Sequence, residues 1–254
     1  MPLADAPRTV DLLWTGGWNS TFRLLSALRL EGAYVRPHYV IDPANPCLEL
    51  EVDAMQRVRA WLGSASPDLA ERLLPTTSAS LDDLLEDDVE AQRFARLKGH
   101  VGLGRHYEWL GRYARHAGLD EVEVGGHRDD PVMSLLRRCL RRVRERPFTG
   151  YRLAEEARET DLGIFARLSF PLADLTRADM RRIALGAGFH EPLELTWFCL
   201  APRRGKPCGV CAKCHAAVED GLGHLLSPAG RRLHALKWHT RWGPWHRVVD
   251  RVVG

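Results

Sequence analysis

VDLLWTGGWNSTF, residues Val10 to Phe22, is the stretch that decides the fold. Its apolar beginning, Val10 to Trp14, predicts a buried strand, and an apolar-periodic helix runs from Phe22. The turn between them contains Gly16 and Gly17 and leads into the helix N-terminus, where free backbone N–H groups and the helix dipole favour an anion. Taken alone, these residues predict either a phosphate-binding loop or an ordinary tight turn.

The composition restricts the class of protein. A chain of 254 residues with 45% hydrophobic content is long enough for one large α/β domain, alone or with a small appendage. The net charge of +3 is too small to indicate nucleic acid by itself. The sequence contains neither an apolar run of the roughly 20 residues that span a membrane nor a signal peptide at Met1. A cytoplasmic protein without membrane contacts is therefore expected.

Strands and helices alternate after the glycine turn. Residues Tyr34 to Ile41 predict a strand, Leu48 to Leu62 an amphipathic helix that ends at Gly63, and Leu73 to Thr77 a short third strand. This alternation predicts an α/β fold with a doubly wound parallel sheet.

The second half of the chain continues the pattern. Residues 82–90 are acidic and predict either a solvated or mobile segment beside a cleft or an exposed helix. A helix is expected over 107–117 and strands over 120–124 and 165–172. A further helix is expected over 176–188, with Thr176 as its N-cap and Asp179 completing a capping box.

A second polar turn follows the strand that ends at Val124. It begins with Gly125 and contains Asp129 and Asp130 before Pro131. Ligands of open parallel sheets lie beyond the carboxyl ends of the strands, so this turn is expected beside the first one. The two carboxylates predict either a site for Mg²⁺ or, more simply, an N-cap for the next helix.

Three further groups of residues have several interpretations. Six arginines between Arg137 and Arg146 predict one basic helix, whose face is either solvated or binds an acidic partner or nucleic acid. The tail from Trp238 to His246 predicts packing onto the main domain, a lid, an oligomer contact or a stacking surface for nucleic acid. Cys47 and Cys139 are interpreted as packing residues.

Four cysteines lie within sixteen positions, which indicates a metal site and not a disulfide framework. The candidate ligands are Cys199, Cys208, Cys211 and Cys214. Four thiolates complete a tetrahedral Zn²⁺ site and leave no open position for a substrate, so a structural zinc is expected. An iron–sulfur cluster also takes four thiolates and is the alternative.

Several segments together resemble a known family. Thr15 to Ser20 resembles the Ser-Gly-Gly-x-Asp-Ser loop of PP-loop ATP pyrophosphatases, with Thr for Ser and Asn for Asp. With the later segments, the chain to about Val218 resembles the 7-cyano-7-deazaguanine synthase family. Those segments are Gly104-Arg105-His106, Val124-Gly125 with Asp130, Pro171-Leu172, Leu175 to Asp179, Leu195 to Cys199, and Cys208-Gly209-Val210-Cys211-Ala212-Lys213-Cys214.

The resemblance implies a reaction and a set of site residues. ATP and Mg²⁺ activate a carboxylate as an acyl-adenylate, pyrophosphate leaves, and ammonia converts the adenylate to an amide and then a nitrile. The implied partners are a small-molecule carboxylate and ammonia; a homodimer is left open, and nucleic acid is not expected. The implied catalytic residues are Asn19, Ser20, Arg105 and Asp130. The implied nucleotide-binding residues are Thr15, Gly16, Gly17, Trp18, Asn19, Ser20, Thr21 and Gly125. Residues 1–192 form the expected ATP-binding domain, and 193–254 form the zinc-binding region with the tail.

The chain departs from the family pattern where a substrate would be recognised. Asn19 replaces Asp, His106 replaces Asn, and Phe198 replaces Ser, while Pro131 to Leu135 replaces an Asp-Cys-Arg-Pro-like stretch. A paralogue that activates another carboxylate is therefore an alternative. Insertion of sulfur or nitrogen into a tRNA base and a non-catalytic nucleic-acid-binding module are two others.

Overall fold

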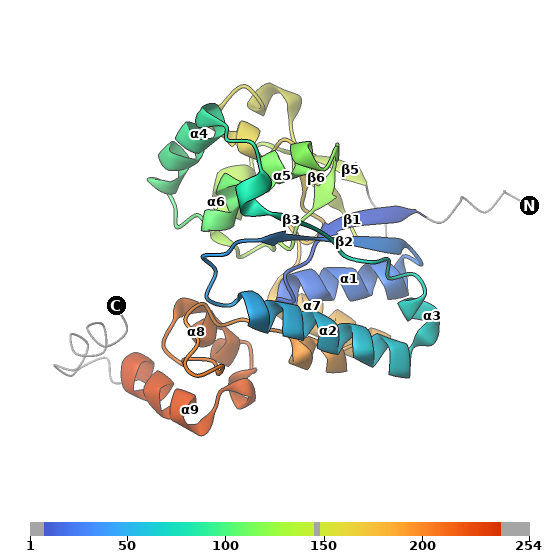
Figure 1. The fold of residues 1–254 in the computed structure, drawn as a ribbon, viewed down its shortest axis with the longest axis vertical. Helices are drawn as coiled ribbons and strands as arrows, with labels where there is room; N and C mark the ends of the chain where they lie inside the picture. The colour runs from blue at the N-terminus through green and yellow to red at the C-terminus, as the bar shows by residue number, and fades with distance from the viewer. Residues whose placement is uncertain (1–7, 145–147, 240–254) are drawn as a thin grey trace, which may run out of the picture.

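The computed structural model describes residues 8–144 and 148–239. Strands and helices alternate along the first two thirds of the chain, as the sequence predicts (Figure 1). The strands are β1 (Thr9–Leu13), β2 (Tyr34–Ile41), β3 (Thr77–Ser80), β4 (Val122–Glu123), β5 (Leu140–Arg144), β6 (Gly150–Leu153) and β7 (Leu168–Ser169). The α-helices are α1 (Trp18–Leu30), α2 (Leu48–Ala65), α3 (Pro67–Ala70), α4 (Asp88–Lys98), α5 (Leu110–His116), α6 (Pro131–Leu136), α7 (Arg177–Ala187), α8 (Ala212–Glu219) and α9 (Pro228–His234).

All seven of these strands form one sheet in the order β3-β2-β1-β4-β7-β6-β5. The five strands from β3 to β7 in this order are parallel, whereas β6 pairs antiparallel with β7 and β5 pairs antiparallel with β6. The predicted α/β class with a mostly parallel sheet is confirmed. The carboxyl ends of β1, β2 and β4 lie at the same edge, so the loops that follow them share one side of the molecule.

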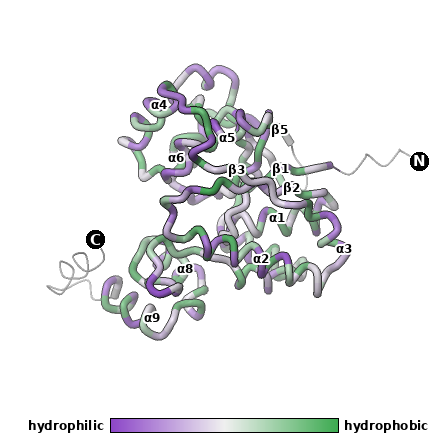
Figure 2. Tube along the Cα trace, in the orientation of Figure 1, coloured by the Kyte–Doolittle hydropathy of each residue, from purple (hydrophilic) through white to green (hydrophobic). Residues whose placement is uncertain are grey.

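Helices cover both faces of the sheet. Helices α1, α2 and α7 lie on one face, and α4, α5 and α6 lie on the other (Figure 1). The residues of β1 alternate between the two cores: Val10 and Leu12 pack in the first, and Leu13 packs in the second. Figure 2 shows hydrophobic and hydrophilic residues alternating along α2, which packs its apolar side against the sheet.

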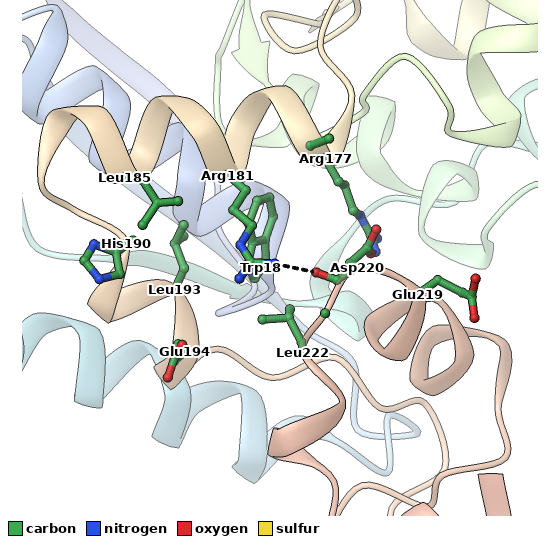
Figure 3. A pocket seen from close by; sticks show the side chains of 12 residues that line it. Trp18, Arg177, Arg181, Leu185, His190, Leu193, Glu194, Glu219, Asp220 and Leu222 are labelled. Carbon is green, nitrogen blue, oxygen red and sulfur yellow. Dashed lines mark hydrogen bonds and ion pairs between the residues drawn. The ribbon is translucent and has the colours of Figure 1, made fainter. Parts of the chain in front are cut away.

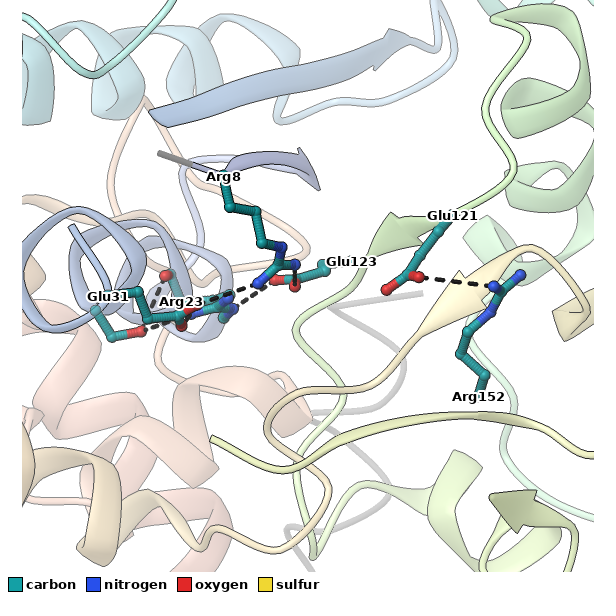
Figure 4. A network of polar contacts seen from close by, with 7 residues as sticks. Arg8, Arg23, Glu31, Glu121, Glu123 and Arg152 are labelled. Carbon is teal, nitrogen blue, oxygen red and sulfur yellow. Dashed lines mark hydrogen bonds and ion pairs between the residues drawn. The ribbon is translucent and has the colours of Figure 1, made fainter. Parts of the chain in front are cut away.

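A charged network crosses the centre of the sheet (Figure 4). Arg23 of α1 is fully buried and donates to Glu123 of β4 at 2.5 Å and to Glu31 at the end of α1. Arg8, the residue before β1, also donates to Glu123, at 2.7 Å. Burial opposes the charged form of Arg23, but the charges of Glu123 and Glu31 outweigh it and raise the pKa of Arg23. The network therefore fixes α1, and the loop before it, to the strand on which the second polar turn is built.

Several predicted elements have other boundaries. Helix α2 continues through Gly63 to Ala65, because a glycine costs only about 1 kcal/mol in a helix and the chain is first stopped by Pro67. The third strand is Thr77–Ser80, and Leu73 makes only an isolated bridge. Within 165–172 only Leu168–Ser169 is a strand.

The predicted arginine helix is wrong. Helix α6 ends at Leu136, and Leu140–Arg144 forms the strand β5 at one edge of the sheet. Pairing with β6 supplies the backbone hydrogen bonds that the sequence pattern assigned to a helix. Arg146 lies outside the described residues, as do Trp242, Trp245 and His246 of the tail.

The acidic segment 82–90 is divided between a short 3-10 helix, Leu81–Asp83, and the first turn of α4. By contrast, α7 begins and ends as predicted: Thr176 and Asp179 form the capping box, and Gly188 closes the helix with φ +73°. No helix among residues 8–144 and 148–239 has both the length and the apolar character needed to cross a membrane.

Candidate active site and metal centre

The glycine turn after β1 has a shape that only glycine permits. Gly16 has φ +66°, and a Cβ at this position would lie 2.6 Å from the carbonyl oxygen of Glu51 in α2. Gly17 is the N-cap residue of α1 and provides no side chain to cap the first turn. The N–H groups at the start of α1 are therefore available to an anion.

The polar side chains of this loop have different environments. The Ser20 hydroxyl is buried and donates to the carbonyl of Gly17 at 3.2 Å. The Thr21 hydroxyl accepts from the indole of Trp14 at 2.9 Å and is fully buried beneath the loop. Thr15 is exposed.

The turn after β4 lies directly against the start of α1, as the sequence predicts. A Cβ on Gly125 would lie 3.1 Å from both the Cβ of Asn19 and the backbone nitrogen of Ser20. The Oδ1 atom of Asn19 is buried and has no hydrogen-bond partner among the described residues. A buried acceptor without a partner is costly, so this atom marks a place where a donor is missing.

Asp130 is the N-cap of α6, because its Oδ1 accepts from the backbone N–H of Val132 at 3.2 Å. The simpler of the two sequence interpretations therefore holds for this carboxylate, whose other oxygen has no hydrogen-bond partner among the described residues. Asp129 is exposed and pairs with Arg128 at 3.5 Å. Arg105 is also exposed, at the same edge of the sheet, and lies 3.6 Å from Asp42 at the end of β2.

Two histidines lie at this edge. His106 is exposed. Protein atoms nevertheless surround it closely enough that desolvation lowers its pKa to about 4; Asp130 acts in the opposite direction and Lys213 in the same direction. His127 is buried, and its pKa is lowered by desolvation and then by the charge of Arg177. The surroundings at this edge of the sheet therefore favour the neutral form of both His106 and His127, although charged groups of both signs lie nearby.

The N-terminal end of α2 is fixed beside the glycine turn. The hydroxyl of Tyr39 donates to Glu51 at 2.7 Å, and the amide of Asn45 donates to the same oxygen at 3.1 Å. Burial raises the pKa of Glu51, while these two hydrogen bonds lower it in part. Because the backbone carbonyl of Glu51 faces Gly16, this arrangement supports the shape of the loop.

The four predicted cysteines converge. Their Sγ atoms all lie within 4.8 Å of one another, and those of Cys208 and Cys214 are 3.8 Å apart. Backbone N–H groups point at the sulfur atoms: Cys208 donates to Cys199, Cys211 donates to Cys208, and Cys214 donates to Cys211, at 3.3 to 3.4 Å. Hydrogen bonds from Cys199 and Cys214 lower the pKa of Cys211, and the contacts with Cys211 raise the pKa of both partners.

This geometry suits a single tetrahedral ion. Zn–S bonds of about 2.3 Å place neighbouring sulfurs roughly 3.8 Å apart, close to the Cys208–Cys214 separation. In a four-iron cluster each thiolate binds a different iron, so the sulfurs lie farther apart. Gly209 between the ligands has φ +81°, and a Cβ there would lie 2.1 Å from the carbonyl of Gly230 in α9.

A cavity of about 350 Å³ lies between α7 and the end of α8 (Figure 3). Trp18 lines it and stacks on Phe22, with ring centroids 6.0 Å apart. Asp220 contacts two arginines of α7 that also line the cavity: its carboxylate pairs with Arg177, and its carbonyl accepts from Arg181 at 3.2 Å. The Trp18 side chain thus faces this cavity.

Comparisons with known proteins leave the family undecided. No family model matches the chain, and no curated protein matches it significantly. Among solved structures, the chain is similar to the U34-tRNA thiolase NcsA from Methanococcus maripaludis with its [4Fe-4S] cluster. The two overlap with a TM-score of 0.42 and 13% sequence identity, over 98% of this chain and 73% of that chain. A predicted subunit of tRNA methyltransferase from Methanocaldococcus jannaschii has a TM-score of 0.28 and 17% identity, over 75% of this chain and 93% of that one. Overlaps of this size carry no inference about chemistry or cofactor.

The structure also adds residues that sequence reasoning did not assign to the site. Cys47, interpreted as a packing residue, donates its thiol hydrogen to the carbonyl of Cys199 at 3.1 Å. Trp197, quoted only as part of a motif, donates its backbone N–H to the carbonyl of Gly16 at 2.9 Å. Both contacts join segments more than 150 positions apart, and no local sequence pattern predicts them.

Proposed function

We propose that the chain activates a small-molecule carboxylate with ATP and transfers the acyl group to ammonia. The observation that carries this proposal is the start of α1, where uncapped N–H groups lie between Gly16 and the close approach of Gly125. Such an arrangement is suited to the negative charge of a triphosphate and of the pyrophosphate that leaves.

The reaction has two steps. A carboxylate oxygen attacks the α-phosphorus of ATP, the bond to the β-phosphate oxygen breaks, and pyrophosphate leaves. The nitrogen of ammonia then attacks the acyl carbon, AMP leaves with the bonding electrons, and the nitrogen loses a proton to give an amide. A second activation, now of the amide oxygen, and loss of that oxygen would give a nitrile. Positioning and charge neutralisation supply most of the acceleration in such steps.

Each site residue has a role in this proposal. The N–H groups at Asn19 and Ser20, with the Ser20 hydroxyl, would hold phosphate oxygens, and the unpartnered Oδ1 of Asn19 would accept from the nucleotide or a bound water. The free oxygen of Asp130 would bind Mg²⁺ through water or directly. Arg105 is able to exchange its long contact with Asp42 for an anionic group of the substrate.

These observations restrict the identity of the carboxylate substrate less than they restrict the type of reaction. The resemblance favours 7-carboxy-7-deazaguanine, whereas His106, Phe198 and the segment after Asp130 differ from that family. The Phe198 ring stacks on that of Trp197 at an interplanar angle of 22°, with centroids 6.4 Å apart, next in sequence to the first cysteine ligand. These departures support the alternative of a different carboxylate. For the cysteine group, we infer a structural Zn²⁺.

The decisive experiment measures pyrophosphate release from ATP and Mg²⁺ with ammonium and 7-carboxy-7-deazaguanine or other carboxylic acids, and identifies the products by mass. Ser20→Ala should slow release about tenfold or more, since a hydrogen bond to a charged group contributes about 1.5–3 kcal/mol. Ser64→Ala is the matched control, because Ser64 also bonds a backbone carbonyl but lies on an exposed turn of α2. No release with any acid would refute the proposal; release with another acid alone would assign that substrate.

A further inference from the structure

The segment that carries the first cysteine ligand is bound on its other side to the glycine turn. The backbone N–H of Trp197 donates to the carbonyl of Gly16 at 2.9 Å. The indole Nε1–H of the same residue donates to the carbonyl of Cys199 at 2.8 Å. One residue therefore contacts both the nucleotide loop and a metal ligand.

Cys199 is the junction of these contacts. Its carbonyl accepts from the indole of Trp197 and from the thiol of Cys47, at 2.8 and 3.1 Å. Its sulfur belongs to the four-thiol group and accepts from the backbone N–H of Cys208 at 3.3 Å. The residue is 1% exposed, so neither set of contacts is readily replaced by water.

The glycine turn is confined by this segment. Gly16 contacts α2 on one side, and a Cβ on Gly17 would lie 3.7 Å from the carbonyl of Trp197 on the other. A turn with a positive φ depends on its surroundings to keep one conformation, and the bond from Trp197 fixes the direction of the Gly16 carbonyl. The direction of this carbonyl in turn sets the orientation of the N–H groups that follow Gly16.

We propose that Trp197 is a positioning residue that makes the nucleotide affinity of the glycine turn depend on metal occupancy at the cysteine group. Cys47 extends the same coupling to the loop after β2. A bound metal holds Cys199, Cys199 holds the indole of Trp197, and the backbone of Trp197 holds Gly16. The inference rests on the proposed nucleotide-binding role of the turn.

Two variants test this coupling while leaving all four metal ligands in place. Trp197→Phe removes the indole donor, and Cys47→Ala removes the thiol donor. Trp61→Phe is the matched control. Trp61 lies in α2, away from the glycine turn, and its indole donates to Glu191 at 3.2 Å, so this variant also loses one indole hydrogen bond. Cys139→Ala is the matched thiol control, because this half-buried cysteine lies outside the four-thiol group.

Three measurements are made on each full-length variant: bound zinc, hydrogen exchange of the amides of residues 16–21, and the equilibrium affinity for ATP. We expect Trp197→Phe to keep its zinc, to exchange these amides faster and to bind ATP about fivefold more weakly, the effect of losing one hydrogen bond. Cys47→Ala should act in the same direction and the two controls should match the wild type. Chelation of zinc from the wild type should produce a larger loss of both protection and affinity.

The possible failures are distinguishable. If zinc-loaded wild type does not bind ATP, the proposed function fails, while the exchange measurement still tests the coupling. If ATP binds and neither its affinity nor the exchange of residues 16–21 differs between Trp197→Phe and Trp61→Phe, the coupling is refuted and the proposed function stands. Loss of zinc in Trp197→Phe would also overturn the inference, since the residue would then act on the metal site alone.

Discussion

Replacing Gly16 by alanine tests the geometry on which the candidate site depends. The residue has φ +66°, a conformation that costs an L-residue about 1–2 kcal/mol. The new Cβ would also lie 2.6 Å from the carbonyl oxygen of Glu51, a backbone atom of α2 that cannot rotate away. Overpacking of this kind costs about 1–3 kcal/mol. Gly16→Ala should therefore lower the free energy of unfolding by roughly 2–5 kcal/mol.

Gly32→Ala separates the two contributions. Gly32 has φ +61°, almost the same as Gly16, but a Cβ there meets nothing within 4 Å. Its replacement should cost only the conformational part, about 1–2 kcal/mol. The difference between the two variants then measures the contact with Glu51.

The assay is urea unfolding at equilibrium, combined with ATP affinity. Gly16→Ala should lose more stability than Gly32→Ala and should also lose ATP affinity, whereas Gly32→Ala should keep it. Equal destabilisation by the two variants would show that α2 moves freely away from the loop. Helix α2 would then not be what fixes the glycine turn.

Three other perturbations follow from the structure. Cys208→Ser should reduce bound metal well below one ion per chain and lower the melting temperature, measured by metal analysis and calorimetry; full metal content would contradict the assigned ligand set. Glu123→Ala should cost about 3–5 kcal/mol in urea unfolding, because it leaves Arg23 buried with part of its charge uncompensated; a loss below about 1 kcal/mol would show that water reaches the network. Hydrogen bonds from Thr176 lower the pKa of Asp179 from 3.8 to about 2, so its stabilisation is present above pH 3.8 and lost as the pH falls toward 2. The stability difference between wild type and Asp179→Asn should vanish over that range, and a constant difference would assign the effect to packing.

Local sequence signals predicted the parts of the fold that depend on neighbouring residues. The strand and glycine turn before α1, the capping box of α7 and the close spacing of the last three cysteines are all readable within a few positions. Each depends on backbone conformation or short-range hydrogen bonds, which the residue types specify directly.

Features that depend on distant partners were not predictable in this way. Leu140–Arg144 is a strand because β6 pairs with it, although its composition also suits a helix. The contact between Cys47 and Cys199 joins residues 152 positions apart. The interpretation of Asp130 required the geometry of α6, since a carboxylate before a helix serves as a cap or as a cation ligand with the same local sequence.

The strand β5 also has a consequence for behaviour in concentrated solution. It is the last strand in the sheet order, and an edge strand offers unpaired backbone groups to a second molecule. Here the edge carries exposed Arg141 and Arg142. Extension of the sheet by another copy would bring guanidinium groups of like charge together and remove them from water. The arginines are therefore expected to oppose extension of the sheet by a second copy at this edge.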